Sequence, residues 1–242
     1  MITLISDLDG TLIGDKKGLE VFREFAEARS GSLSIIYATG RNAAEFEAAL
    51  ETENLPQYDG CILNTGADIF IRQGGDYIRA REWRDKIGLN WEKEKILAGL
   101  RDMSGIQMQG KDETYKISYF VDEEKAADIR RSVEEKFEEH GIKADVLLSH
   151  GVFMDILPAG CDKGSAGKYL MEKTGRGNTR VIAAGDSEND TALFKCFKGG
   201  IVVSNARQGF IEEINADDHY MAEAPYGCGV VEGIKYYMRM MR

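Results

Sequence analysis

The sequence predicts an α/β fold in which a doubly wound parallel sheet carries a smaller, inserted α+β domain. Apolar runs near residues 2–6, 34–38 and 180–184 each end in polar residues, and the later ones open into helical patterns. Strands that alternate with helices in this way are typical of a parallel sheet covered on both faces. Roughly 120 residues separate the second polar strand end from the next one, which is too many for a crossover. This length predicts the second domain.

The first apolar run, ITLIS, stops at two carboxylates, Asp7 and Asp9, which a Gly-Thr turn follows. Open α/β sheets bind ligands at the carboxyl edge of their strands, where both acids would lie. Residues two apart on a strand point the same way, so both can face one pocket. At about 4 Å their repulsion is roughly 4 kcal/mol, so both stay charged only beside a cation. An Asp-Gly pair that merely forms a turn is the alternative.

The second run ends at Thr39, Gly40 and Arg41, just before the helical pattern of residues 42–53. A helix start offers free backbone N–H groups to an anion, and a guanidinium adds charge-assisted hydrogen bonds. We therefore expect Gly40 and Arg41 to bind the anionic part of a substrate. The alternative is that Thr39 and Asn42 only cap the helix.

A third strand end precedes Asp162 and Lys163, and the helical pattern that begins there ends at Gly175. Asp162 suits the N-cap position. A lysine in the first turn is disfavoured by the helix dipole, so a nearby negative group is expected to compensate. A solvated lysine is the alternative.

The fourth strand end, in residues 180–193, carries several acids. Asp186 follows the apolar run, and Glu188, Asn189 and Asp190 open another helix. Acids this close repel unless a cation lies between them, and carboxylate oxygens suit Mg²⁺. A helix cap accounts for one or two of them but not for Asp186. Because parallel strands end at one edge of a sheet, we expect all four strand ends to form a single site.

Composition excludes several classes of partner. The chain has 242 residues, 43% of them hydrophobic, and a formal net charge of −10. A nucleic-acid backbone or an anionic membrane would repel such a chain. Its four cysteines have the spacing of neither a zinc site nor a disulfide framework. The first strand begins at Ile2, leaving no room for a signal peptide, and no apolar run approaches the roughly 20 residues of a membrane span. We expect a cytoplasmic protein, as a monomer.

The insert begins with a hairpin, ADIFI to YIRA, attached to the core. From residue 81 the pattern changes to a helix at 83–103, a strand around Ile106, a strand at YKISYFV, a helix at 123–140 and a strand pair that turns at Ser149-His150-Gly151. This predicts two helices on a four-stranded sheet. The predicted domains are 1–80, the first part of the core; 81–158, an α+β cap; and 159–242, the second part of the core.

The four strand ends, in this order, resemble the haloacid dehalogenase (HAD) superfamily of phosphotransferases; they are DLDGT, ATGR, DKG and GDSEND. Within it the chain is most similar to the sucrose-phosphate phosphatases, on the further runs ISDLDGTLIGD, YKISY, MDILP and IVVSNA. The resemblance implies a Rossmann-like core with a cap, and a Mg²⁺-dependent phosphatase. The implied substrate is a sugar phosphate, with sucrose 6-phosphate as the leading candidate.

Carried over by position, the resemblance implies that Asp7 is the nucleophile and that Asp9 protonates the leaving oxygen and later activates water. Thr39 and Lys163 would hold the phosphoryl oxygens. Mg²⁺ would be bound by Asp7, by the backbone carbonyl of Asp9, and by two further acids, Asp186 and Asp190, the latter as a ligand or directly behind one.

Sugar recognition is expected from the cap residues Lys116, Tyr119 and Asp155, and from Asn189 and Asn205 in the core; Tyr119 packed inside the cap and a solvated Lys116 are the alternatives. The chain departs from the family at Tyr115 and at the pair Cys161-Asp162, which leaves the identity of the sugar open, including another hexose or glycosyl-osmolyte phosphate. A phosphomannomutase is disfavoured by ATGR. A non-catalytic phosphosugar sensor is disfavoured because the three acids at positions 7, 9 and 186 are present.

Overall fold

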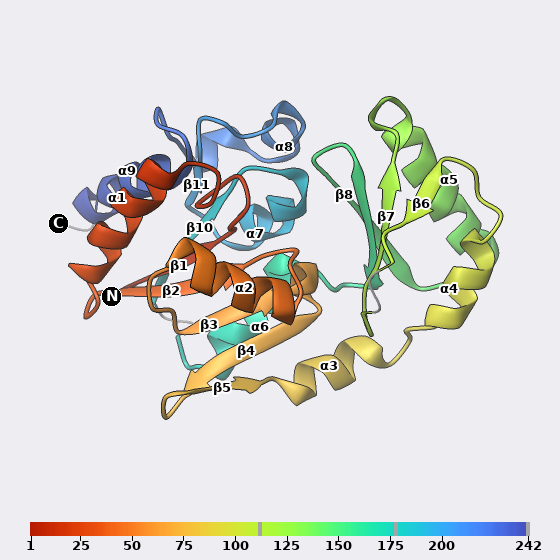
Figure 1. The fold of residues 1–242 in the computed structure, drawn as a ribbon, viewed down its shortest axis with the longest axis horizontal. Helices are drawn as coiled ribbons and strands as arrows, with labels where there is room; N and C mark the ends of the chain where they lie inside the picture. Colours follow the sequence, from red (N-terminus) through yellow and green to blue (C-terminus); the bar gives the residue numbers. More distant parts are fainter. Residues whose placement is uncertain (111–112, 177–178, 241–242) are drawn as a thin grey trace.

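A computed structural model describes residues 1–110, 113–176 and 179–240 and shows two sheets side by side (Figure 1). The larger sheet has the strand order β12-β11-β10-β1-β2-β3-β4-β5. Its strands are β1 (Ile2–Ser6), β2 (Leu33–Ala38), β3 (Gly60–Leu63), β4 (Asp68–Gln73), β5 (Asp76–Arg79), β10 (Arg180–Gly185), β11 (Gly200–Val202) and β12 (Tyr220–Met221). The strands from β12 to β3 pair in parallel, whereas the predicted hairpin β4–β5 adds antiparallel strands at one edge. The predicted α/β core is confirmed.

Strand β1 lies at the centre of this sheet, between β2 and β10. Its last residue, Ser6, is level with Tyr37 of β2 and Ala184 of β10. The residues after Ser6, after Ala38 and after Gly185 therefore emerge at the same edge, where polar side chains were predicted to meet.

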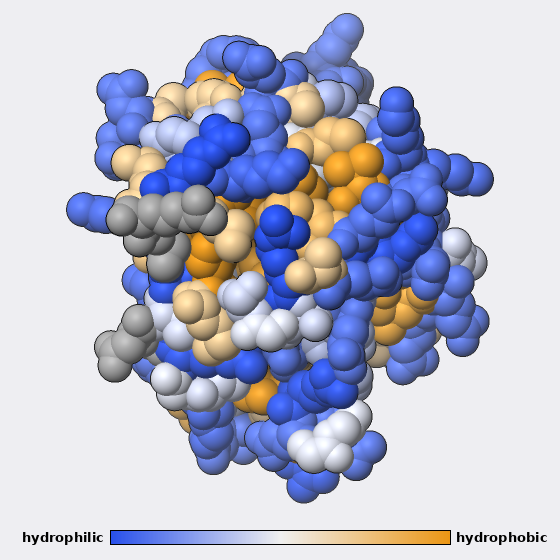
Figure 2. Space-filling view, turned by 90° about the vertical axis from the view of Figure 1, so that its left-hand side faces the viewer, coloured by the Kyte–Doolittle hydropathy of each residue, from blue (hydrophilic) through white to orange (hydrophobic). Residues whose placement is uncertain are grey.

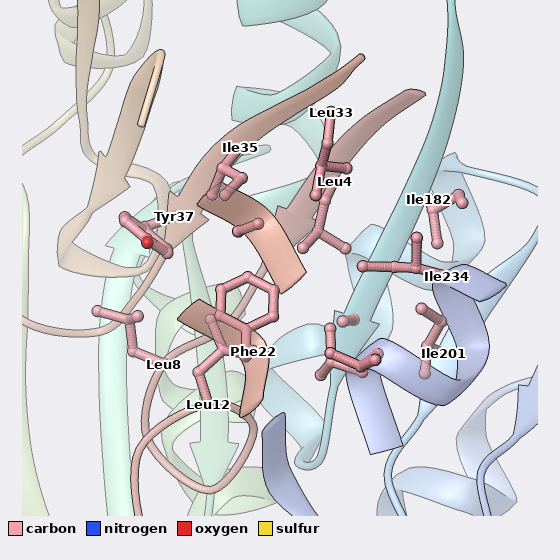
Figure 3. Close-up of a cluster of buried hydrophobic side chains, with 14 of the residues drawn as sticks. Leu4, Leu8, Leu12, Phe22, Leu33, Ile35, Tyr37, Ile182, Ile201 and Ile234 are labelled. Atoms are coloured by element: carbon pink, nitrogen blue, oxygen red, sulfur yellow. The ribbon is translucent and has the colours of Figure 1, made fainter. Parts of the chain in front are cut away.

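Helices cover both faces of the larger sheet, as the buried, nearly continuous apolar strands require. They are α1 (Lys16–Glu27), α2 (Ala43–Glu53), α3 (Arg81–Gly88), α6 (Lys163–Lys173), α7 (Thr191–Cys196), α8 (Gln208–Glu213) and α9 (Tyr226–Arg239). On one face, Phe22 of α1 and Ile234 of α9 pack with Leu4 and Ile182 (Figure 3). A second apolar cluster lies on the other face, beneath α6 and α7.

The smaller sheet is antiparallel, with the order β6-β7-β9-β8. Its elements are β6 (Ile106–Met108), β7 (Ile117–Val121), β8 (Ala144–Ser149), β9 (Phe153–Pro158) and the helices α4 (Lys93–Leu100) and α5 (Ala126–Glu139). The helices cover one face and enclose a separate apolar core that includes Val133 and Ile156. The predicted two helices on four strands are confirmed. We call this unit the cap.

The prediction of one helix over residues 83–103 is wrong, because the structure has α3 and α4 with a break between them. The two helices serve different cores. Trp83 and Ile87 of α3 pack in the second cluster of the larger sheet, whereas Ile96 and Leu100 of α4 pack in the cap. The division into residues 1–80, 81–158 and 159–242 stays a proposal, and the packing of α3 favours moving the first boundary past Gly88.

Four short 3₁₀ helices complete the described chain, η1 (Asn64–Gly66), η2 (Glu123–Lys125), η3 (Glu188–Asp190) and η4 (Ala216–Asp218). The face of the core that lies on the left in Figure 1 is largely hydrophilic, with small hydrophobic patches between polar side chains (Figure 2). Patches of this size are ordinary on protein surfaces. Among the described residues, no helix is long and apolar enough to cross a membrane.

Candidate active site

The strand ends of the core converge on the ammonium of Lys163. Its Nζ lies 2.7 Å from Oδ1 of Asp7, 2.7 Å from Oδ1 of Asp190 and 3.1 Å from Oδ1 of Asn189. The lysine is fully buried in the first turn of α6. The two carboxylates are the negative groups that its unfavourable place at a helix start predicted. Although burial lowers the pKa of Lys163, Asp190 and Asp7 raise it overall, so the lysine is positively charged.

Asp7, Asp186 and Asp190 form a buried carboxylate cluster, with one ligand atom of each within 4.8 Å of the others. Burial, with the neighbouring carboxylates Asp190 and Asp186, raises the pKa of Asp7 well above its usual value. Burial and Asp190 raise the pKa of Asp186 to about 7. One lysine thus does not offset three acids. The oxygen-only donor set and the unbalanced charge fit a divalent cation such as Mg²⁺.

Hydrogen bonds hold this cluster in place. The hydroxyl of Thr11 donates to Oδ1 of Asp186 at 2.7 Å, and Oδ2 of Asp190 accepts from the backbone N–H groups of Asp186 and Ser187. Gly10 has φ +89°, and a Cβ there would lie 2.4 Å from the carboxylate of Asp186. Only glycine therefore lets the turn after Asp9 pass so close to the cluster.

Asp9 lies outside the carboxylate cluster, on the solvent side. Its two carboxylate oxygens accept from Nε and Nη2 of Arg41, at 2.8 and 2.6 Å. This two-pronged ion pair means that the guanidinium expected to bind an anion is engaged with Asp9 here. Thr39 is buried beside them, and its hydroxyl oxygen accepts from the backbone N–H of Arg41 at 3.2 Å.

A cavity of about 600 Å³ lies between the core and the cap and reaches the predicted nucleophile. Asp7, Asp9 and Arg41 line it from the core, and residues including Gln109, His150 and Phe153 line it from the cap. Its size suits a small organic molecule. The arrangement places a buried, charged group at the bottom of a cavity whose upper wall is polar and aromatic.

The family model described as sucrose-6F-phosphate phosphohydrolase matches residues 1–238 of the chain. The chain belongs to this family. Among known relatives, it is 28% identical to mannosylfructose-phosphate phosphatase of Agrobacterium fabrum, over 97% of this chain and 96% of that protein. It is also 28% identical to sucrose-phosphatase 2 of Nicotiana tabacum, over 87% of this chain. The chain spans 52–59% of the length of the plant relatives, so it corresponds to part of them.

Solved structures agree with this family. The sucrose-phosphatase of Synechocystis sp. PCC6803, determined in complex with sucrose and phosphate, matches with a TM-score of 0.89 and 27% identity over 98% of this chain and 97% of that one. A HAD subclass IIB sugar phosphatase matches with a TM-score of 0.68 at 19% identity, over 100% of this chain and 99% of that one, a likeness of fold. The predicted HAD-like core with a cap is confirmed.

Of the three cap residues predicted to bind the sugar, two line the cavity and one does not. Lys116 and Asp155 both line the cavity, but they are bonded to each other at 3.0 Å and to the core. For Tyr119 the prediction is wrong. It alternates with Lys116 and Ser118 along β7, so it points to the other face of the sheet, where it is 4% exposed in the cap core. The run Ile117, Tyr119, Val121 is the apolar side of the strand.

Of the two asparagines expected near the sugar, Asn189 lines the cavity and accepts from Lys163. Asn205 does not line it. Its Nδ2 donates to the carbonyl of Gly10 at 2.7 Å, and its Oδ1 accepts from the N–H of Tyr226 at 2.9 Å. Asn205 therefore braces the turn after Asp9, and its assignment to the sugar is corrected.

Sequence reasoning missed several residues of the site. Thr11 directly follows the Asp-Gly pair. Its hydroxyl reaches Asp186 because the ends of β1 and β10 lie side by side. His150 was seen only as part of a turn; the turn brings its Nε2 to 3.8 Å from Oδ2 of Asp186. Phe153 lines the cavity two residues before Asp155 on β9, so the strand alternation would have found it, and Phe120 is its neighbour on β7.

Proposed function

We propose that the chain is a phosphoric monoester hydrolase that cleaves a sugar phosphate, with sucrose 6-phosphate as the first candidate. The observation that carries this proposal is the contact between Asp7 and Lys163 within a buried carboxylate cluster at the bottom of a cavity. A carboxylate that accepts a hydrogen bond from a charged lysine is well placed to attack a phosphate group. The same lysine can stabilise the negative charges of the phosphate oxygens. Membership of the family supports the reaction class.

The reaction requires two displacements at phosphorus. In the first, a carboxylate oxygen of Asp7 forms a bond to phosphorus, the bond to the sugar oxygen breaks, and Asp9 gives its proton to that oxygen. In the second, water attacks the phosphorus, Asp9 takes a proton from the water, and the bond to Asp7 breaks. Lys163 and the buried Thr39 would hold the phosphoryl oxygens. The pair of Asp9 with Arg41 has to open before Asp9 can act as the acid.

A divalent metal is part of this proposal. Asp7, Asp186 and Asp190 would hold Mg²⁺ with the backbone carbonyl of Asp9. The ion would neutralise charge on the phosphoryl group, which is the largest contribution expected in phosphate transfer. The buried, unbalanced acids support this assignment.

The cap would select the sugar. Phe120 and Phe153 are paired across β7 and β9, their ring centroids are 5.7 Å apart, and they are 44% and 37% exposed. Exposed aromatic faces beside a cavity are unusual without a ligand, and they suit the apolar face of a sugar ring. Gln109 and His150 line the same wall and offer polar atoms to hydroxyl groups.

Mannosylfructose phosphate is the second candidate. The relative named for it matches this chain over nearly the full length of both proteins. Both candidates are disaccharide phosphates, so they share the site described above.

A panel of phosphate esters tests the proposal. We expect the purified protein with Mg²⁺ to hydrolyse sucrose 6-phosphate or mannosylfructose phosphate with a higher kcat/KM than glucose 6-phosphate, fructose 6-phosphate or p-nitrophenyl phosphate. Preference for a monosaccharide phosphate would refute the choice of substrate. Failure to hydrolyse any ester would refute the reaction class.

A further inference from the structure

The turn η1 has an unfavourable backbone. Asn64, Thr65 and Gly66 all have positive φ, at 52°, 58° and 117°. For a β-branched residue such as Thr65 this conformation is rare and costs conformational energy, so neighbouring contacts must maintain it. The side chain and the backbone of Thr65 are both fully buried, which places the strain inside the molecule.

The backbone of this turn is bonded to the predicted phosphate loop. The N–H of Thr65 donates to the carbonyl of Thr39 at 3.0 Å, and the N–H of Asn64 donates to the carbonyl of Arg41 at 2.9 Å. On the other side, a Cβ on Gly66 would lie 2.5 Å from the backbone of Asp162, the residue before Lys163. The turn therefore touches two of the four strand-end segments of the active site.

The side chain of Thr65 reaches the cap instead. Its hydroxyl donates to Oδ2 of Asp155 at 3.0 Å, and Lys116 donates both to that oxygen at 3.0 Å and to the carbonyl of Gly40 at 2.8 Å. Ser118 donates to the other oxygen of Asp155 at 2.6 Å. Both oxygens of Asp155 are thus bonded within the protein. Lys116 and Asp155 are 6% and 9% exposed, so their bonds are little screened by solvent.

We propose that Thr65, Lys116 and Asp155 form a coupling cluster that ties the position of the cap to the phosphate loop of residues 39–41. This proposal rests on the phosphatase function above and gives Lys116 and Asp155 a positioning role in place of sugar recognition. The cap would contact the core through the same turn that orients Thr39 and Arg41. A cap that closes would therefore set the loop that holds the phosphoryl group, whatever the leaving group is.

Thr65→Val and Thr65→Ser are a matched pair for the test. Valine keeps the size and the branched Cβ and removes the hydroxyl, whereas serine keeps the hydroxyl. We expect Thr65→Val to lower kcat/KM by roughly tenfold or more, the usual effect of losing a hydrogen bond to a charged group, and Thr65→Ser to stay close to the parent. The loss should be of similar size for a disaccharide phosphate and for p-nitrophenyl phosphate.

A second variant keeps the test decisive if Thr65→Val does not fold. Lys116→Met keeps most of the aliphatic stem and removes the bonds to Gly40 and Asp155, and we expect it to lower kcat/KM on both esters as well. Non-additive losses in Thr65→Val, Lys116→Met and the double variant would support one coupled cluster.

Three results would overturn the coupling. They are a loss confined to the disaccharide phosphate, which would make the cluster a sugar site; equal losses in Thr65→Val and Thr65→Ser, which would make size the cause; and unchanged kinetics in both Thr65→Val and Lys116→Met. An inactive parent protein would instead refute the phosphatase proposal, so the two failures are distinguishable.

Discussion

The core and the cap present their side chains to the shared cavity by different means. In the core, the parallel strands β1, β2 and β10 end at one edge, so the residues after them meet whatever the rest of the chain does. In the cap, the antiparallel strands β7 and β9 cross the cavity wall, and only alternate residues face it. Under the proposed function, the strand ends of the core would therefore supply the reacting groups, and the strand faces of the cap would select the substrate. A substitution at a strand end of the core would abolish the reaction. A single substitution on a strand face of the cap would instead change which substrate is preferred.

The largest expected effect lies at a strand end of the core. Asp7→Asn should remove detectable turnover on every phosphate ester, because an amide does not attack phosphorus, while Lys163 keeps its bond to Asp190. Because burial and neighbouring acids raise the pKa of Asp7, a neutral residue relieves repulsion there. We expect the thermal midpoint of the metal-free variant to be no lower than that of the parent.

Asp76→Asn, at an exposed position of the hairpin, makes the same chemical change away from the site and should keep full activity. Near-native turnover in Asp7→Asn would mean that water attacks the phosphate directly.

Metal removal should abolish the reaction at the strand ends of the core and leave the fold of both sheets unchanged. With a chelator in excess, we expect hydrolysis of both a disaccharide phosphate and p-nitrophenyl phosphate to stop, and to return when Mg²⁺ is added back. Circular dichroism should show an unchanged fold, because the separate apolar cores of the two sheets do not depend on the ion. Full activity after exhaustive chelation would contradict the assignment of Asp7, Asp186 and Asp190 to a metal.

The contrast between strand ends and strand faces also explains which site residues could be predicted from the sequence. Asp7, Lys163 and Asp186 were predictable because each lies in a short motif at a strand end, and the parallel sheet brings such ends together. Tyr119 was misassigned because a motif on a strand does not state which face reaches the cavity. The role of Thr65 depends on contacts with two segments distant in sequence, at Thr39 and Asp155, and its positive φ is not evident from the residue type.

Two further features were beyond the sequence for the same reason. The ion pair of Arg41 with Asp9 joins a loop to a strand end 32 residues away, so neither motif alone indicates it. The break after Gly88 follows from packing, because α3 covers the larger sheet and α4 covers the cap. A helical pattern records the periodicity of the segment and not the number of cores that it serves.

A smaller and more selective effect is expected from the cap. Phe153→Leu, and the same change at Phe120, keep an apolar side chain and remove the flat ring. We expect kcat/KM for the best disaccharide phosphate to fall by roughly tenfold, in the range of 1–3 kcal/mol for altered pocket contacts, while p-nitrophenyl phosphate changes little. Met108→Leu is a matched control, since Met108 pairs with Tyr119 on the helix-facing side of the sheet. A similar loss on both esters would move these rings from sugar selection to cap closure.

The smallest expected effect is on stability and not on activity. It is tested by comparing a histidine of the core with a histidine of the cap. In the core, Nδ1 of His219 accepts from the N–H of Gly200 at 3.0 Å, and the ring lies against Phe194. Burial lowers the pKa of His219 below 6.5, although Asp218 opposes this. Below pH 6.5 the unfolded chain takes up a proton that the folded chain resists, so this histidine contributes stability that is present above that pH and lost as the pH falls.

His219→Asn keeps an acceptor near the position of Nδ1 and removes the titration. We therefore expect the loss of thermal midpoint between pH 7 and pH 5 to be smaller in this variant than in the parent. His140→Asn makes the same change at the exposed histidine at the end of α5 in the cap and is the control for the loss of a histidine elsewhere. Scanning calorimetry of the three proteins, without metal, isolates the effect, because the carboxylate cluster contributes equally to all of them. If His219→Asn loses as much stability on acidification as the parent, folding does not lower the pKa of His219, and the predicted contribution of this ring to the pH dependence is wrong.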